Sequence, residues 1–480
     1  MMAAIPEDGA CAKRRTVKPE ASRRGLSLFP AATSPDSHPA PAGLFESFLS
    51  RENLARALKR VEQNHGAPGP DGMRTEELRP WLSAHWLEVR ARLDAGTYRP
   101  SPVRRVFIPK PGGKVRGLGV PTVLDRLIQQ ALLQVLTPIF DPHFADRSYG
   151  FRPGRSAHQA VRAAQEAIQS GHGWVVDLDL ESFFDRVNHD ALMARCARRI
   201  EDKKVLRLLR AYLNAGVMQD GVKVAQEEGT PQGSPLSPLL ANIMLDDLDQ
   251  ELAGRGHQFV RYADDIMIYV KTRRAGERVM QSTRTFVEKR LKLRVNEEKS
   301  AVAPATSRPF LGFGFFFRDG EVKVRLDPKA RAAAKMRLRR LTGRSWRVRM
   351  EVRIAALNRF SRGWTVYFAL ADTPSVFEEL DKWLRRRLRQ VRWKEWKKRA
   401  GRYRGLVAQG IPAWQAREWA GSGRGPWRVA GSPILQRALP VAYWQNQGLA
   451  GFLGPYRQLW DARRTAGCGP ACPVVWEGPG

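Results

Sequence analysis

The sequence predicts an α+β fold, in which strands that carry acidic residues are combined with amphipathic and strongly basic helices. Residues 174–180 and 259–270 are rich in β-branched and aromatic residues, which favour strands. Apolar residues recur at helical spacing over residues 54–61 and 124–135. From residue 327 the composition shifts to long basic stretches that predict helices. Strand-bearing and wholly helical parts in one chain are typical of an α+β protein.

The net charge points to a polyanionic partner. The chain has 480 residues, enough for two or three domains, and 81 Lys and Arg against 48 Asp and Glu give +33. Such a surplus favours nucleic acid over a membrane. No apolar run approaches the ~20 residues of a membrane span, and no secretory leader opens the chain. We therefore expect a cytoplasmic, nucleoid-associated protein with no membrane partner.

The cysteines predict neither a disulfide framework nor a zinc site. The chain has four of them, at positions Cys11, Cys196, Cys468 and Cys472. They are too few and too scattered for disulfides, so we expect reduced thiols. Cys468 and Cys472 could form half a zinc site, but no second Cys or His pair lies near them in the sequence.

The N-terminal region divides into an extension and a helix. Residues 1–44 are rich in Pro, Ala, Ser and Arg without periodicity, which predicts disorder. Ser50 is a candidate N-cap for a helix whose apolar stripe continues to Val61. A loop dense in Gly and Pro follows at residues 66–72.

Residues 103–120 predict two strands joined by a Pro-Gly-Gly turn. Lys110, Lys114 and Arg116 cluster around that turn. Such a hairpin can fold over a phosphate chain, because its cations would meet the phosphate oxygens. The alternative is a solvated basic hairpin.

Two segments bring carboxylates to the ends of strands. Asp177 and Asp179 lie on one face of the strand predicted over residues 174–180, and Asp185 follows shortly after. Asp264 and Asp265 would lie in the turn of a hairpin formed by residues 259–270. Adjacent carboxylates repel each other, and a divalent metal ion is the natural counter-charge. The alternative is a solvated Asp-Asp turn, since Asp is a common turn residue.

Together, Asp179, Asp264 and Asp265 predict a two-metal site. Three carboxylates from adjacent strands can hold two Mg²⁺ ions at the ~3.5–4 Å separation of two-metal phosphoryl transfer. One ion would activate a primer hydroxyl and the other would neutralise the triphosphate. The cations expected to complete a nucleotide site are Lys110, Arg116 and Lys299.

Further segments predict contacts with a nucleic acid. The Gly/Pro-rich loop that begins at residue 229 enters a helix at Ser237, and its glycines would permit close approach to a base pair or sugar. A helix and a strand are predicted over residues 286–293, and an aromatic-glycine strand over residues 309–315.

Residues 327–410 predict a basic helical surface. They contain 24 Lys and Arg against 7 Asp and Glu, with five Trp interleaved, which favours a nucleic-acid surface over an ordinary solvated face. In residues 382–399, three apolar residues at helical spacing should pack inward, namely Leu384, Leu388 and Val391. The cations expected to contact nucleic acid from the other faces are Arg385, Arg386, Lys397 and Lys398.

The motifs resemble those of a known family. Residues 262–265 read Tyr-Ala-Asp-Asp, which is similar to the signature turn of reverse transcriptases. Blocks like those of bacterial group II intron reverse transcriptases occur in order at residues 71–72, 116–122, 148–155, 179–185, 231–238, 296–299 and 310–312. Segments similar to that family's maturase or thumb region lie at residues 393–397, 424–428 and 443–449. The resemblance covers residues 44 to 462 approximately.

The resemblance implies a right-hand polymerase that copies RNA into DNA with Mg²⁺. Residues 45–326 would form the fingers and a palm with an antiparallel sheet, and residues 327–462 a helical thumb or maturase (X) domain. Residues 1–44 would be a disordered basic extension and residues 463–480 a short tail. Like the short class C lineage, the chain is expected to lack the DNA-binding and endonuclease domains of longer relatives.

The resemblance also implies roles for single residues. Asp179, Asp264 and Asp265 would bind the two Mg²⁺ ions, with the carbonyl of Leu180 as a further ligand and Lys299 as proton donor to pyrophosphate. The residues implied to contact nucleotide or primer are Lys110 and Arg116 at the triphosphate, Gln232 beside the templating pair, Phe184 as a steric gate against ribose, and Phe310, Leu311 and Gly312 at the primer.

The implied partners are group II intron RNA, whose splicing the protein would assist, an RNA template with a DNA primer, dNTPs and a DNA target. Three alternatives stay open. An RNA-dependent RNA polymerase also uses an Asp-Asp turn, but Phe184 and the Tyr-Ala before Asp264 speak against it. A non-catalytic RNA-binding splicing factor would be expected to lose one of the three acids. A domesticated reverse transcriptase in DNA repair or phage defence is the third.

Overall fold

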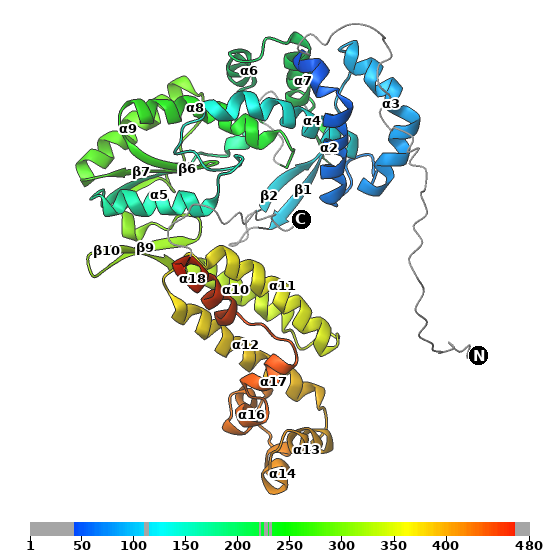
Figure 1. The fold of residues 1–480 in the computed structure, drawn as a ribbon, viewed down its shortest axis with the longest axis vertical. Helices are drawn as coiled ribbons and strands as arrows, with labels where there is room; N and C mark the ends of the chain where they lie inside the picture. Colours follow the sequence, from blue (N-terminus) through cyan, green and yellow to red (C-terminus); the bar gives the residue numbers. More distant parts are fainter. Residues whose placement is uncertain (1–42, 110–114, 220–221, 225–228, 230–232, 466–480) are drawn as a thin grey trace.

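The computed structural model describes residues 43–109, 115–219, 222–224, 229 and 233–465. The extension predicted over residues 1–44 and the tail predicted over residues 463–480 therefore lie almost entirely outside the described residues. Leu44 differs from that prediction, because it opens helix α1 (Leu44–Phe48). Figure 1 shows an upper part of mixed strands and helices and a narrower helical part below it.

A small sheet and several helices form the N-terminal side of the upper part. Strands β1 (Val103–Pro109) and β2 (Val115–Val120) pair antiparallel, as predicted for this hairpin. The sheet order is β2-β1-β4-β5, with β4 (Val217–Gln219) and β5 (Val222–Val224). The predicted cap Ser50 begins α2 (Arg51–Gln63), because its side chain accepts from the Asn53 amide. The other helices here are α3 (Leu78–Asp94), α4 (Val123–Phe140), α6 (His189–Ala197) and α7 (Lys203–Leu213).

A central antiparallel sheet separates two hydrophobic cores. Its order is β6 (Gln258–Tyr262), β7 (Asp265–Val270), β3 (Trp174–Leu178) and β8 (Ala301–Pro304). Side chains alternate across it, so that Val176 and Ile268 enter one core while Val175 and Tyr269 enter the other. Helices α8 (Ser237–Gly254) and α9 (Arg273–Arg290) cover the first face, and α5 (Ala157–Gln169) covers the second (Figure 1).

Two predicted strands differ from the structure. Strand β9 (Phe313–Arg318), which pairs with β10 (Glu321–Leu326), begins later than predicted, because the chain reverses at Leu311 and Gly312. The strand predicted after α9 is reduced in the described structure to one bridge, between Val295 and Leu180. In both places a residue with positive φ, Leu311 or Lys292, interrupts the extended conformation.

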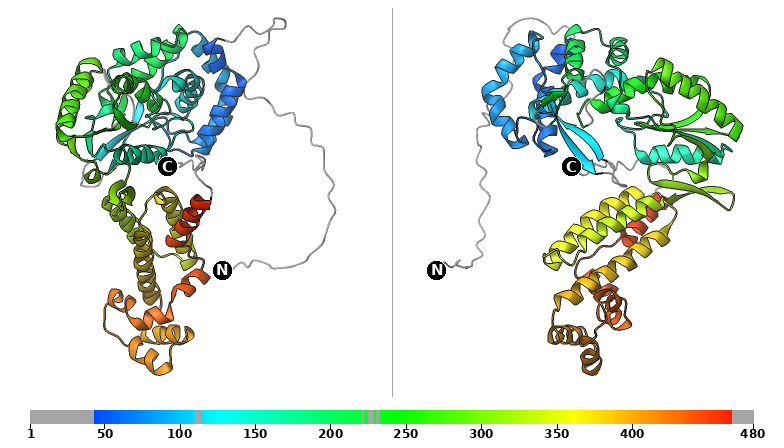
Figure 2. Two further views of the ribbon diagram at one scale, coloured as in Figure 1. Left: turned by 60° about the vertical axis from the view of Figure 1, so that its left-hand side comes forward. Right: turned by 180° about the vertical axis from the view of Figure 1, so that it is seen from behind.

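The helical part, residues 328–465, is present where basic helices are predicted. Its long helices α10 (Pro328–Leu341), α11 (Met350–Phe368) and α12 (Pro374–Glu395) pack with α18 (Leu453–Thr465) (Figures 1 and 2). Shorter helices lie beyond them, namely α13 (Arg399–Ala408), α14 (Ala413–Ala420), α15 (Pro426–Ala430), α16 (Pro433–Ala438) and α17 (Val441–Asn446). Among the described residues, no helix is both long and apolar enough to cross a membrane.

Candidate active site

The turn between β6 and β7 presents two adjacent acids. Tyr262 pairs with Asp265 across the hairpin, so Ala263 and Asp264 alone form the turn, and Asp265 is the first residue of β7. The prediction that both acids lie in the turn is therefore wrong for Asp265. Ala263 has a φ of 56°, the left-handed conformation that tight hairpin turns require.

Asp179 lies at the same end of the sheet as this turn. Strand β3 ends at Leu178, which pairs with the start of β7, and Asp179 follows directly. The Asp265 residue is exposed at the surface, but nearby protein atoms exclude part of the water that would otherwise solvate its carboxylate. This desolvation, followed by the charges of Asp264, Asp177 and Asp179, raises the pKa of Asp265 to about 6. The structure thus places the predicted acids at the same end of the central sheet.

Lys299 forms an ion pair with Asp179. Its Nζ lies 3.0 Å from Asp179 Oδ2, and its charge lowers the pKa of Asp265. The main chain of Asp179 is also fixed, since its carbonyl accepts from the Asn296 amide at 2.8 Å and its amide donates to Ser300 Oγ at 3.0 Å. Residues 296–300 therefore hold both the backbone and the side chain of Asp179.

The donor set fits a hard divalent cation. Carboxylate oxygens are ligands that Mg²⁺ prefers in proteins. The Asp179 carbonyl and the Glu181 amide bond to the segment around Val295, so the Leu180 carbonyl between them points to the opposite side, where β7 lies. Within the described residues, no three Asp, Glu, His or Cys side chains are already drawn together as a metal site.

A buried arginine supports the turn from within the protein. The side chains of Arg261 and Asp249 are both fully buried, and Arg261 Nε donates to Asp249 Oδ1 at 2.8 Å. Arg261 Nη1 donates to the Ala263 carbonyl and to Asn242 Oδ1, both at 2.9 Å, and Nη2 donates to Ser148 Oγ at 2.7 Å. This network was not predicted from the sequence, because its members come from separate elements.

The loop over residues 148–156 lies against the same turn. A Cβ atom on Gly150 would collide with the backbone nitrogen of Ala263, so glycine is required there. Next to it, Phe151 has a φ of 57° and is 59% exposed, with its ring centroid 6.2 Å from that of Tyr262. An aromatic face is therefore accessible beside the acidic turn.

Phe184 follows Asp179 by five residues, in the segment after β3. It is half-buried in the short 3-10 helix η3 (Phe183–Asp185), edge-on to the Phe183 ring. A Cβ on Gly229 would lie 3.0 Å from the Phe184 carbonyl, and one on Gly233 would lie 2.9 Å from the Gly119 carbonyl of β2. The predicted Gly-rich loop thus starts beside Phe184 and ends beside the basic hairpin.

Three predicted nucleotide contacts remain predictions. Lys110 and Gln232 lie outside the described residues. Arg116 lies on β2 opposite Ile108, and its side chain also lies outside the description.

Comparison with known proteins identifies the family. Residues 108–315 match the family described as reverse transcriptase (RNA-dependent DNA polymerase). Residues 331–409 match the maturase-specific domain of group II introns. The chain belongs to the group II intron reverse transcriptases. The predicted family and its RNA-directed DNA polymerase activity are therefore confirmed.

Individual relatives show how far the similarity extends. Protein YkfC of Escherichia coli (strain K12) is 34% identical over 349 residues, which are 62% of this chain and 90% of that protein. The group II intron-encoded protein LtrA of Lactococcus lactis subsp. cremoris is 30% identical over 318 residues, which are 52% of each protein. A chain in a solved partial Cas6-RT-Cas1--Cas2 complex is 26% identical over 52% of this chain and 43% of that chain, but its TM-score of 0.34 supports no conclusion.

In this reverse transcriptase, the turn at residues 310–312 lies where the upper part meets the helical part. Phe310 is buried, and its amide and carbonyl both bond to Phe313, at 2.7 and 2.9 Å. Leu311 and Gly312 have positive φ, and a Cβ on Gly312 would lie 3.2 Å from the ring of Phe368 on α11. The predicted primer contact is thus a strained turn packed against α11.

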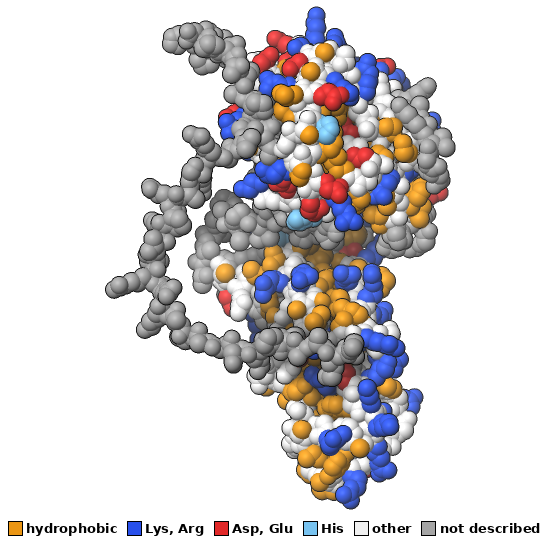
Figure 3. Space-filling view, turned by 90° about the vertical axis from the view of Figure 1, so that its right-hand side faces the viewer, with side chains coloured by type: hydrophobic (Ala, Val, Ile, Leu, Met, Phe, Trp, Pro, Cys, Tyr) orange, Lys and Arg blue, Asp and Glu red, His pale blue; other side chains and the backbone are white. Residues whose placement is uncertain are grey.

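The cations of α12 and the residues after it are only partly exposed. Figure 3 shows Lys and Arg side chains over the helical part, with few acidic ones between them. Lys397 and Lys398 are exposed as predicted, and Arg385 is half-buried. Arg386 is also half-buried, because its guanidinium lies 4.1 Å from the ring centroid of Trp427 on α15, so the predicted exposure is only partial for both arginines. The residues predicted to pack inward are buried, namely Leu384, Leu388 and Val391.

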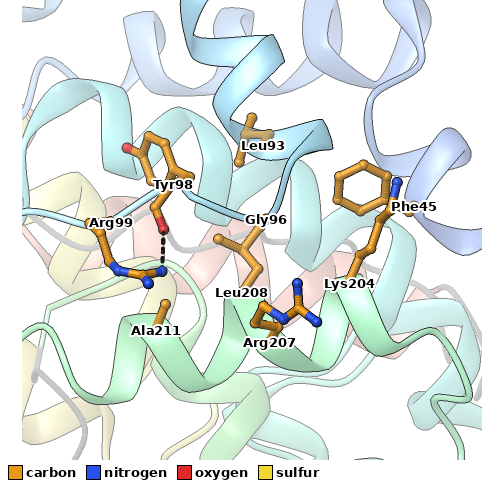
Figure 4. A pocket seen from close by; sticks show the side chains of 9 residues that line it. All are labelled: Phe45, Leu93, Gly96, Tyr98, Arg99, Lys204, Arg207, Leu208 and Ala211. Atoms are coloured by element: carbon orange, nitrogen blue, oxygen red, sulfur yellow. Dashed lines mark hydrogen bonds between the residues drawn. The ribbon is translucent and has the colours of Figure 1, made fainter.

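A small pocket on the N-terminal side is separate from these residues. Figure 4 shows Arg99, Lys204 and Arg207 around it, together with Phe45 of α1. The Lys204 ammonium lies 4.9 Å from the Phe45 ring centroid, so this cation already has an aromatic partner. None of the predicted site residues lines the pocket.

Proposed function

We propose that this reverse transcriptase extends a DNA primer along an RNA template with dNTPs, using two Mg²⁺ ions held by Asp179, Asp264 and Asp265. The observation that carries the proposal is the gathering of these acids and Lys299 at one end of the central sheet. When bound, the two ions would activate the primer hydroxyl and neutralise the triphosphate and leaving pyrophosphate.

The protein's own groups would order the reacting atoms. The Leu180 carbonyl would add a neutral ligand beside the three acids. Lys299 would exchange its present contact with Asp179 for one with the leaving pyrophosphate and supply a proton to it. Arg261 would keep the turn that carries Asp264 in place through the Ala263 carbonyl.

Other residues would select the nucleotide. Phe184 would collide with the 2′ hydroxyl of a ribonucleotide and admit deoxyribose. The remaining proposed contacts are Lys110 and Arg116 with the triphosphate, Gln232 with the templating pair, and Phe310, Leu311 and Gly312 with the primer. In this assignment, residues 45–326 form the fingers and palm of a right-hand polymerase, and residues 327–462 form the thumb or maturase domain.

We also propose that the helical part binds group II intron RNA to assist its splicing, before the protein reverse transcribes the intron at a DNA target. The maturase-specific match over residues 331–409 and the cationic surface of those helices support this role. Exposed Lys397 and Lys398 are the best-placed of the predicted cations, and Arg385 can contribute from its half-buried position.

The test is primer extension by the full chain on an RNA template with a DNA primer, dNTPs and Mg²⁺. Asp264→Asn serves as the inactive control. Binding to a group II intron RNA is measured in parallel against a structured RNA of equal length. Both roles are supported if the wild type extends the primer and Asp264→Asn does not, and if the wild type binds the intron RNA more tightly than the structured control RNA. If Asp264→Asn extends the primer as well as the wild type does, the assignment of the acids is overturned.

Two alternatives give different results in the same experiment. A non-catalytic splicing factor would bind the intron RNA without extending the primer, and it would be expected to have lost one of the three acids, all of which this chain retains. A reverse transcriptase domesticated for DNA repair or phage defence would extend the primer without preferring the intron RNA.

A further inference from the structure

The C-terminal end of α11 is bonded to the turn at residues 310–312. The hydroxyl of Tyr367, a half-buried residue immediately before the last residue of α11, donates to the carbonyl of Leu311 at 3.0 Å. Leu311 has a φ of 51°, a conformation that costs a branched side chain free energy and persists only where the surroundings enforce it. The Tyr367 bond is one of the contacts that enforce it.

Aromatic packing fixes Tyr367 on the side of the central sheet. Its ring centroid lies 5.6 Å from those of both Phe313 and His158, and the His158 Nε2 lies 2.5 Å from the Tyr367 carbonyl. Phe368, the next residue, packs at 5.2 Å against Phe313. The end of α11 is therefore held by β9 and α5 as well as by the Leu311 bond.

Tyr367 also lies within electrostatic reach of the acidic turn. Burial, followed by the neighbouring Tyr262 and Asp265, raises the pKa of Tyr367 to about 12. The phenol thus keeps its proton at neutral pH and can donate to Leu311 throughout the working range. The Tyr367 side chain thus bonds to the turn at residues 310–312 and also feels the charge of Asp265.

We infer that Tyr367 is a positioning residue, which couples α11 to the turn at residues 310–312 and so places the primer terminus against Asp264 and Asp265. The inference rests on the proposed function, in which this turn contacts the primer. A hydroxyl that attacks a triphosphate must be aligned within a fraction of an ångström. Without the bond, Leu311 relaxes toward an ordinary backbone conformation, and the primer terminus loses its alignment.

The same arrangement supports the other turn at the site. Ala263 also has positive φ, and its carbonyl accepts from buried Arg261, as the Leu311 carbonyl accepts from Tyr367. In each of the two turns, the carbonyl of the residue with positive φ therefore accepts a hydrogen bond from a side chain outside the turn. Arg261 belongs to the sheet itself, whereas Tyr367 comes from the helical part, so of these two side chains it is Tyr367 that links the placement of α11 to the turn at residues 310–312.

The test uses Tyr367→Phe, which removes the hydroxyl and keeps the ring. Tyr456→Phe on α18 is a matched control, because the Tyr456 hydroxyl also donates to a backbone carbonyl, that of Ala371, at 2.9 Å. One hydrogen bond contributes a similar amount in each case, so both variants should lose similar thermal stability. For Tyr367→Phe alone we expect a single-turnover extension rate lowered about three- to tenfold, shorter products per binding event and an unchanged KM for dNTP.

A second readout does not depend on the chemical step. A 2-aminopurine base at the primer 3′ end reports by its fluorescence how firmly that end is held. Tyr367→Phe should change this signal in the bound complex, and Tyr456→Phe should leave it as in the wild type. Equal signals in all three proteins overturn the inference, whether or not the wild type extends the primer. If the wild type does not extend the primer but the fluorescence of Tyr367→Phe differs as expected, the proposed polymerase chemistry is overturned and the positioning role of Tyr367 still holds.

Discussion

The ammonium group of Lys299 lies 3.0 Å from Asp179 Oδ2, at the end of the sheet where Asp264 and Asp265 also lie. A single positive charge thus offsets part of a group of acids that repel one another. Because a divalent cation would attract the carboxylates more strongly than one ammonium does, metal binding should release Lys299 from Asp179. The pairing therefore links the assignment of the metal ligands to that of the proton donor.

The first prediction concerns the acidic turn. Asp264→Asn keeps the size of the side chain and removes a charge that we assign to metal binding, so primer extension should fall by several orders of magnitude. Intron-RNA affinity and the thermal unfolding midpoint should stay near those of the wild type. Single-turnover extension measures the first quantity. Near-normal extension would show that Asp264 does not bind the metal.

Phe184→Ala should relax discrimination between sugars. Removing the ring takes away the clash with the 2′ hydroxyl, so incorporation of ribonucleotides should rise relative to deoxyribonucleotides. Phe183 is buried in the core, so its ring is not placed to act as a gate. Phe183→Ala therefore serves as a control for the loss of packing. The ratio of kcat/KM for the two nucleotides is the measurement, and a constant ratio places the gate elsewhere.

The pH profile should report Asp265. Its pKa of about 6 means that it becomes protonated, and a poorer metal ligand, as the pH falls through 6. At limiting Mg²⁺ the extension rate should fall in that range, and more Mg²⁺ should move the fall to lower pH. Lys299 lowers this pKa, so Lys299→Met should move the fall to higher pH, whereas Lys271→Met at the opposite end of β7 should not. If Lys299→Met does not shift the pH at which the extension rate falls, Lys299 does not influence the titration of Asp265.

Arg261→Met should destabilise the protein strongly. The substitution leaves the buried carboxylate of Asp249 without its partner, which costs about 3–5 kcal/mol in the free energy of unfolding. Arg79→Met breaks the solvent-exposed pair with Glu62 and should cost less than about 1 kcal/mol. Adding Asp249→Leu to Arg261→Met should restore part of the loss. Urea unfolding compares the variants, and equal midpoints for the two arginine variants would refute the role of the buried pair.

Neutralising Lys397 and Lys398 together should weaken RNA binding. For every phosphate that is no longer neutralised, the slope of log affinity against log salt should become shallower by about 0.7–0.9. Extension at saturating substrate should change little. Lys271→Ala with Lys289→Ala removes two exposed lysines from the upper part and is the matched control. Arg386→Ala should instead lower the unfolding midpoint, because its guanidinium packs on Trp427. Equal salt slopes for the two lysine pairs would mean that Lys397 and Lys398 face only solvent.

The sequence by itself determined the family, the RNA-directed DNA polymerase activity and much of the local structure. The order of the motifs, the acids at strand ends and the basic helices are properties of neighbouring residues. The cap at Ser50, the hairpin of β1 and β2 and the buried stripe of α12 follow from local periodicity in the same way.

Only the tertiary structure decided which residues support the site. Arg261 lies in β6 and its ion-pair partner Asp249 lies in α8. The Tyr367 hydroxyl donates to the Leu311 carbonyl, although the two residues are 56 positions apart in the sequence. Arg386 shows the reverse case, in which a residue predicted to be exposed is partly covered by Trp427, 41 positions away in the sequence. Periodicity identifies the inward face of one element, but packing decides which other element lies against it, because contacts between elements depend on how the whole chain folds.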